Sequence, residues 1–227
     1  MKGTLERDYA EQRESRRALK YRLRRRADEA VEALKAFCPA PARILDLGTA
    51  EGRMLARIKD RFPTTLCVGL EYSSDLVDMG VRLFPEIAFL RADAQSLRYF
   101  KAASFDAVVA AAIIEHLEDP AEMLRESARV LRPGGILILT TPHPFWEHLA
   151  GRLGMIKGEH SSVMGLRALR ELGRAAGFRI LEEKGFMFSP VGFPGELLVE
   201  RLLRGLKLDR CLANQLMVLG KPQEVEA

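Results

Sequence analysis

Three acidic residues lie at or near the ends of apolar runs of the chain, where a ligand site often forms. Asp46 lies in the run 43–47, Glu71 closes the run 65–70, and Asp93 follows the run 87–90. If these runs are neighbouring parallel strands, their carboxyl ends meet at one edge of the sheet and the acids converge there. Carboxylates accept hydrogen bonds from vicinal ribose hydroxyls and from an exocyclic amine, so the spacing indicates a nucleotide-like ligand. Taken singly, each acid is more typical of a solvated loop.

A glycine-rich turn adjoins the first of these acids. Gly48 and Gly52 lie between a predicted strand and a predicted helix, and without a Cβ they let the chain turn tightly and approach a ligand. Dinucleotide-binding proteins place a pyrophosphate on such a turn. Here, however, Ala50 occupies the middle glycine position, and Asp46 would repel a pyrophosphate and suit a cationic ligand. A plain tight turn is the alternative interpretation.

The elements that must position these residues alternate between strands and helices. Alternation with short loops predicts βαβ units with right-handed crossovers, and therefore a doubly wound α/β fold with a mainly parallel sheet and helices on both faces. Strands are predicted at 43–47, 65–70, 87–90, 105–110, 136–140, 178–188 and 215–220, and helices follow the N-terminal helix at 54–61, 74–83, 120–131, 166–176 and 195–208.

Composition narrows the class of protein. A chain of 227 residues with 48% hydrophobic and 29% charged residues is long enough for one α/β core, so we expect a single domain over 1–227. No apolar run reaches the ~20 residues that cross a bilayer, and we expect a cytoplasmic protein. Cys38, Cys67 and Cys211 are far apart and form no C-x-x-C pair, so neither a disulfide framework nor a metal site is predicted.

Basic residues are concentrated near the N-terminus, within a stretch whose leucines and alanines recur at helical spacing. The helix either presents a solvated face or binds an anionic partner such as RNA, acidic lipid headgroups or a phosphorylated substrate. The basic residues are Arg13, Arg16, Arg17, Lys20, Arg22, Arg24, Arg25 and Arg26.

From Ile44 to Pro142 the chain resembles the class I, Rossmann-like S-adenosylmethionine-dependent methyltransferases, in the broad group that includes quinone-biosynthesis methyltransferases. Six segments in order carry the resemblance, and together they are far more specific than any one of them. They are 44–52 (ILDLGTAEG), 69–73 (GLEYS), 91–94 (RADA), 105–109 (FDAVV), 114–120 (IEHLEDP) and 130–135 (VLRPGG). The resemblance also implies a seven-stranded sheet with an antiparallel last strand, for which 216–220 is the candidate.

The resemblance implies S-adenosylmethionine as cofactor and a set of residues around it. The methionine part would be held by Asp46, Gly48, Thr49, Ala50 and Gly52, and the ribose by Glu71. The adenine would lie against Tyr72, Asp93 and Ala94, and the sulfonium end against Ala110 and Ala111. The sequence departs from the family pattern at Ala50, often glycine, and at Thr49, often cysteine or another small residue.

Methyl transfer from a sulfonium is an in-line displacement, so catalysis depends mainly on alignment of the acceptor. A phenol or carbon acceptor also needs a general base, for which histidine titrates in the right range. His116, His143 and His160 are the candidates, in that order, whereas His148 is expected on the surface. Bracing a loop is an equal alternative for His116.

The expected organisation is an N-terminal helical cap (1–38), a cofactor-binding core (39–142) and a substrate-side part (143–227) with a helical insertion at about 189–210. The apolar segment 186–208 is a lid over an apolar acceptor, a surface that touches a membrane, or a packing or oligomer contact. The expected function is methyl transfer to a small molecule related to lipids, quinones or glycans. The alternatives are an RNA methyltransferase that uses the basic helix and a non-catalytic cofactor-binding protein.

Overall fold

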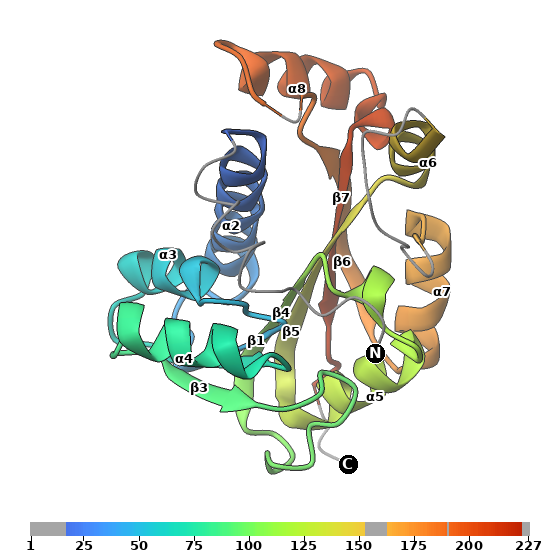
Figure 1. Cartoon of the computed structure of the whole chain (residues 1–227). Helices are drawn as coiled ribbons and strands as arrows, with labels where there is room; N and C mark the ends of the chain where they lie inside the picture. The colour runs from blue at the N-terminus through green and yellow to red at the C-terminus, as the bar shows by residue number, and fades with distance from the viewer. Residues whose placement is uncertain (1–16, 153–162, 190, 224–227) are drawn as a thin grey trace.

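The structure is a computed structural model that describes residues 17–152, 163–189 and 191–223 (Figure 1). Seven strands form one sheet in the order β3-β2-β1-β4-β5-β7-β6. All neighbours pair in parallel except β7, which is antiparallel to both β5 and β6, so the predicted fold class is confirmed. The strands are β1 (Arg43–Leu47), β2 (Leu66–Glu71), β3 (Ala88–Arg91), β4 (Phe105–Ala111), β5 (Leu131–Pro142), β6 (Arg179–Phe186) and β7 (Asn214–Gly220).

Helices cover both faces of the sheet, as Figure 1 shows. On one face lie α2 (Arg17–Phe37), α3 (Arg53–Arg61) and α4 (Ser74–Leu83), and on the other α5 (Pro120–Val130) and α7 (Leu166–Ala175). Three further helical segments, η1 (Ile114–His116), α6 (Pro144–Arg152) and η2 (Asp209–Cys211), were not predicted from the sequence. The remaining helix is α8 (Glu196–Gly205), within the predicted insertion.

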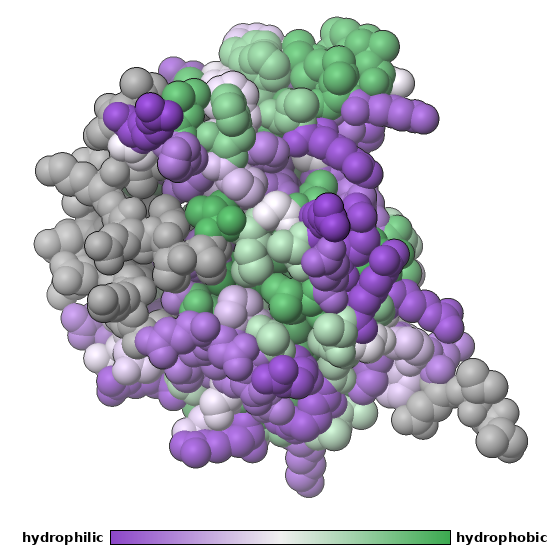
Figure 2. All heavy atoms as spheres, turned by 90° about the vertical axis from the view of Figure 1, so that its right-hand side faces the viewer, coloured by the Kyte–Doolittle hydropathy of each residue, from purple (hydrophilic) through white to green (hydrophobic). Residues whose placement is uncertain are grey.

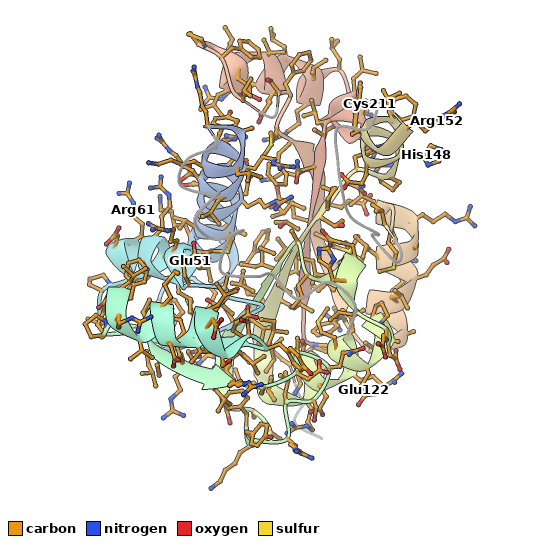
Figure 3. All side chains as sticks on the ribbon, viewed as in Figure 1. Glu51, Arg61, Glu122, His148, Arg152 and Cys211 are labelled. Atoms are coloured by element: carbon orange, nitrogen blue, oxygen red, sulfur yellow. The ribbon has the colours of Figure 1, made fainter. Side chains whose placement is uncertain are left out.

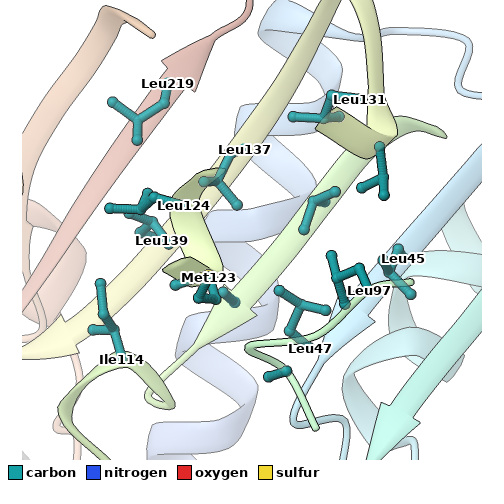
Figure 4. Close-up of a cluster of buried hydrophobic side chains, with 14 of the residues drawn as sticks. Leu45, Leu47, Leu97, Ile114, Met123, Leu124, Leu131, Leu137, Leu139 and Leu219 are labelled. Carbon is teal, nitrogen blue, oxygen red and sulfur yellow. The ribbon is translucent and has the colours of Figure 1, made fainter. Parts of the chain in front are cut away.

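Alternate residues of the central strands fill two separate cores, because a parallel strand covered on both faces buries every side chain. Leu45 and Leu47 of β1 face α5, in the cluster that Figure 4 shows with Leu124 and Leu137. Ile44, which precedes Leu45 and points to the opposite face, packs instead with residues of α2 and α3. The continuous apolar runs in the sequence therefore reflect two-sided burial.

β5 is longer than predicted. It begins at Leu131, which pairs with Phe105, and its register then shifts so that Ile136 pairs with Ala107. The Pro-Gly-Gly segment at 133–135 was predicted as a turn before the strand, but it forms an irregularity within it. Gly135 O accepts a hydrogen bond from Lys221 N at 2.9 Å, which keeps that segment bonded to the chain beyond β7.

The basic N-terminal stretch divides in the structure. Arg25 is only 7% exposed and Arg26 donates to Asn214 Oδ1 at 2.9 Å, so both point into the protein, whereas Arg24 is exposed. Arg13 and Arg16 lie outside the described residues. The described part of this stretch is therefore not a single solvated face. Among the helices that the structure describes, none combines the length and the hydropathy needed to span a membrane.

Candidate functional site

The turn after β1 is held against the end of β2. Leu70 O accepts hydrogen bonds from both Gly48 N (2.8 Å) and Thr49 N (3.1 Å). The backbone then takes positive φ at Gly48 (69°), Ala50 (50°) and Gly52 (88°) before α3 begins. Glycine adopts such angles freely, whereas at Ala50 the left-handed conformation costs about 1–2 kcal/mol.

Close contacts, in addition to φ, require the two glycines. A Cβ on Gly48 would lie 2.5 Å from Ile113 Cδ1, and one on Gly52 would lie 2.6 Å from the Phe89 ring. Ile113 follows β4 and Phe89 belongs to β3, so the turn is packed between side chains from two other strands. Its shape is therefore fixed by its neighbours as well as by its own sequence.

The Glu71 carboxylate ties the glycine turn to the end of β2. Its Oε2 accepts a hydrogen bond from Ala50 N at 2.9 Å, and its Oε1 accepts from Tyr72 N at 2.8 Å and Ser73 N at 3.0 Å. The side chain is 7% exposed. A carboxylate offers about four acceptor positions, so these three amides leave capacity for a ligand hydroxyl.

Two further acids are buried around the turn. Asp46 is 2% exposed, and its backbone lies between Gly69 of β2 and Val109 of β4. Glu51 is 1% exposed and its Oε1 lies 3.2 Å from Arg53 Nε. Figure 3 shows Glu51 at the start of α3. The sequence interpretation missed Glu51, although an acid within a glycine turn with an arginine two residues later is a usable signal for an ion pair.

Asp93 begins a hydrogen-bonded chain between two loops. Its Oδ1 accepts from Gln95 N at 2.9 Å, and Gln95 Oε1 accepts from Asp119 N at 2.6 Å. The loop after β3 is fixed further by Arg129 of α5, which donates to the backbone oxygens of Leu97 and Phe100. Gln95 was not identified from the sequence, because its partner Asp119 is distant in the chain.

The end of β4 lies beside the end of β1, because Ala110 pairs with Leu47. Ala110 is fully buried, Ala111 is half-buried, and Ala112 has a φ of 53°, which turns the chain toward η1. In η1, Glu115 is 1% exposed and its Oε2 accepts from Thr141 Oγ1 at 3.3 Å. His116 follows and is half-buried at the same edge of the sheet.

The remaining histidines lie in other segments of the chain. His143 follows β5, its Nδ1 accepts from Phe145 N at 3.2 Å, and burial lowers its pKa from the ordinary histidine value. His148 is exposed on α6 and points outward in Figure 3, as the sequence indicates. His160 lies outside the described residues.

Strand register brings most of the predicted cofactor residues to one edge. Leu47 pairs with Leu70 and with Ala110, and Glu71 pairs with Arg91, so β1 to β4 end in one row. Tyr72 is 44% exposed beside this row, whereas Ala94 is 2% exposed. Among the described residues no group of His, Cys, Asp and Glu side chains is arranged to hold a metal ion, and all three thiols are free.

Comparisons with known proteins place this geometry among methyltransferases. The sequence model described as "Methyltransferase domain" matches residues 15–183. Trans-aconitate 2-methyltransferase of Azoarcus sp. is 29% identical over 136 residues, which are 60% of this chain and 53% of that protein. Demethylmenaquinone methyltransferase of Deinococcus radiodurans is 30% identical over 175 residues, 65% of this chain and 72% of that protein. The aligned part thus spans about half the length of the former relative.

Solved structures share the fold at lower identity. A chain solved in complex with the Haloferax volcanii Trm112 methyltransferase activator gives a TM-score of 0.69 at 23% identity, covering 87% of this chain and 90% of that chain. Phosphoethanolamine N-methyltransferase 2 of Haemonchus contortus, solved with S-adenosyl-L-methionine, gives 0.63 at 17% identity, covering 86% of this chain and 53% of that chain.

Proposed function

Because this chain belongs to the methyltransferase domain family, we propose that it transfers the methyl group of S-adenosylmethionine to a small-molecule acceptor. The observation that carries the proposal is the row of strand ends where the glycine turn, Glu71 and the Asp93 loop meet. Ligands of doubly wound sheets bind at such an edge. A cationic cofactor with ribose hydroxyls and an exocyclic amine matches the acids gathered there.

The residues at this edge fit the cofactor. Thr49 Oγ1 is buried and has no hydrogen-bond partner among the described residues, so a ligand donor would satisfy it. We assign the methionine part to the turn around Gly48, with Asp46 favouring its positive charge. Glu71 would accept from the ribose, and Asp93 with the Ala94 amide would bind the adenine beside Tyr72. Bound S-adenosylmethionine supplies an electrophilic methyl group.

The protein's own contribution is alignment and proton transfer. Since His143 Nδ1 accepts a hydrogen bond from Phe145 N, the neutral imidazole carries its proton on Nε2, which is then a hydrogen-bond donor. His143 is therefore suited to orienting the acceptor. We propose His116, which lies in η1 just beyond the end of β4, as the general base for an acceptor that loses a proton.

We propose a small acceptor of apolar character, related to lipids or quinones, because apolar side chains lie near the substrate side. Phe145 and Trp146 lie at the start of α6, the helix that comes after β5, and are 60% and 44% exposed. Relatives named for a quinone and for a small organic acid agree with a small-molecule acceptor. An RNA acceptor is less favoured, because Arg25 and Arg26 of the basic stretch point into the protein.

Calorimetric titration with S-adenosylhomocysteine tests the cofactor site. We expect Glu71→Gln to weaken binding by about 1.5–3 kcal/mol, the contribution of a hydrogen bond to a charged group. Glu171→Gln on α7, whose side chain is 66% exposed, is the matched control and should bind like the parent protein. Equal affinities for all three proteins would refute the ribose assignment. Failure of the parent protein to bind both S-adenosylhomocysteine and S-adenosylmethionine would refute the proposed function.

A further inference from the structure

Helix α8 is oriented with its charged residues inside and its leucines outside. Glu196 and Glu200 are each 3% exposed, whereas Leu198, Leu202 and Leu206, which follows the helix directly, are 61%, 61% and 69% exposed. An amphipathic helix on a globular protein normally has the opposite orientation. Figure 2 shows the result as hydrophobic atoms gathered at the top of the molecule, where Figure 1 places α8.

Specific contacts hold the buried acids of α8. Arg25 Nη2 of α2 lies 3.0 Å and 2.7 Å from the two carboxylate oxygens of Glu200, and Met187 N donates to Glu200 Oε1 at 2.9 Å. Tyr21 Oη donates to Glu196 Oε2. Removing one partner from a buried ion pair is strongly destabilising. The helix therefore cannot rotate its leucines inward without breaking these contacts, and the outward leucines belong to the folded state.

The outward surface around the leucines is cationic. From 188 to 212, excluding residue 190, the described acids are Glu196, Glu200 and Asp209, and all three are buried. The basic residues of the same stretch are exposed: Arg201, Arg204, Lys207 and Arg210. Of these, Arg210 pairs with Glu183 at 2.7 Å. The acids of this segment are turned inward, while arginine and lysine remain beside the leucines.

A recess lined by charged residues adjoins α8. A cleft of about 520 Å³ between α2, α3 and α8 is lined by basic residues that include Arg61, Arg201 and Arg204, by the acids Asp28, Glu29, Glu32 and Glu200, and by Leu197. Arg57 also lines it and pairs with Asp28. Arginine is well suited to phosphate recognition, because its planar fork forms paired hydrogen bonds. Arg201 and Arg204 thus line this cleft together with Leu197.

We propose that α8 docks this protein on the surface of a bilayer that contains anionic phospholipid. The leucines enter the boundary between headgroups and acyl chains, and Arg201, Arg204 and Lys207 meet the phosphates, as in helices that lie in the plane of a membrane. A second copy of this chain fits less well, because a symmetric contact would bring the same cations together. The inference goes beyond the proposed function and does not depend on it.

The connection that contains α8 begins and ends at the edge of the sheet where β5 ends. β6 ends and β7 begins at the edge where β5 ends, since Asn214 pairs with both Phe186 and Pro142. The connection that contains α8 therefore leaves the sheet at the same edge as the proposed cofactor site. A protein docked through α8 presents this edge near the bilayer.

Flotation of the full chain with vesicles tests the proposal. We expect binding to phosphatidylcholine vesicles that contain phosphatidylglycerol, weaker binding to phosphatidylcholine alone, and release by salt. Arg201→Gln with Arg204→Gln should reduce the partition coefficient about fivefold for each cation removed. Leu198→Ser, Leu202→Ser and Leu206→Ser combined should reduce it at least about fivefold per leucine.

Matched controls separate docking from general hydrophobicity. Leu66, Val81 and Leu83 are 49%, 50% and 46% exposed outside this surface, so their combined change to serine should leave vesicle binding unchanged. Thermal melting of each variant checks the fold, which truncation of exposed leucines should preserve. Absence of parent binding to anionic vesicles, or parent-like binding by the triple leucine variant, would overturn the proposal. So would a parent dimer in sedimentation that the leucine variant converts to monomer.

Discussion

Substitution of Gly52 tests how tightly the glycine turn after β1 is packed. Its φ is +88°, and a Cβ there would lie 2.6 Å from Phe89 Cζ. Gly177 has nearly the same φ, +85°, but a Cβ there meets no atom within 4 Å. Gly52→Ala and Gly177→Ala therefore carry the same backbone strain, and only the first adds a steric clash.

The expected costs follow from these two contributions. The left-handed backbone costs an alanine about 1–2 kcal/mol at either position. Overpacking against Phe89 adds about 1–3 kcal/mol at Gly52 alone. Each kcal/mol lowers the melting temperature of a protein of this size by roughly 2–4 °C. Urea denaturation should therefore show Gly52→Ala to be the less stable variant by about 1–3 kcal/mol.

A double variant identifies the source of the difference. Phe89→Leu removes the Cζ atom, so Gly52→Ala combined with Phe89→Leu should recover part of the added loss in a double-mutant cycle. S-adenosylhomocysteine affinity, measured on the same proteins, should fall for Gly52→Ala and stay at the parent value for Gly177→Ala. Equal stability losses for the two alanine variants would refute the close packing of the turn.

Three other measurements address separate parts of the structure. Arg25→Met should cost about 3–5 kcal/mol of folding stability, because it leaves buried Glu200 without its cation. Arg24→Met, at a side chain that is 70% exposed, should cost less than about 1 kcal/mol. Equal urea midpoints for the two variants would contradict this prediction. Burial lowers the pKa of His143, so the contribution of this group to stability is present above its unfolded pKa and is lost as the pH falls. The drop in the urea midpoint from pH 7.5 to 5.5 should therefore be smaller in His143→Asn than in the parent protein. A thiol reagent at pH 8 should modify one cysteine per native chain, Cys211, because the others are buried and burial raises the pKa of Cys67 to about 11; rapid reaction of three would contradict it.

Local patterns in the sequence were sufficient to predict the sheet and the edge where its ligand site lies. Apolar runs buried on both faces, such as 105–110, predict central parallel strands whatever surrounds them. The resemblance supplied the antiparallel last strand, which the pairing of β7 with β5 confirms. The start of β5 was missed, because a Pro-Gly-Gly segment is typical of a turn and only its pairing partners keep it in the strand.

Other features depended on contacts between residues far apart in the chain. Periodicity alone predicts that the leucines of α8 form one face and its glutamates another, but not which face is buried. Arg25, 175 residues from Glu200, decides that, because a buried carboxylate needs a cation and a backbone donor that only the folded chain brings to it. Likewise, the acids around Gly48 follow from sequence position, whereas the hydrogen bond from Ala50 N to Glu71 forms only once β1 and β2 pair.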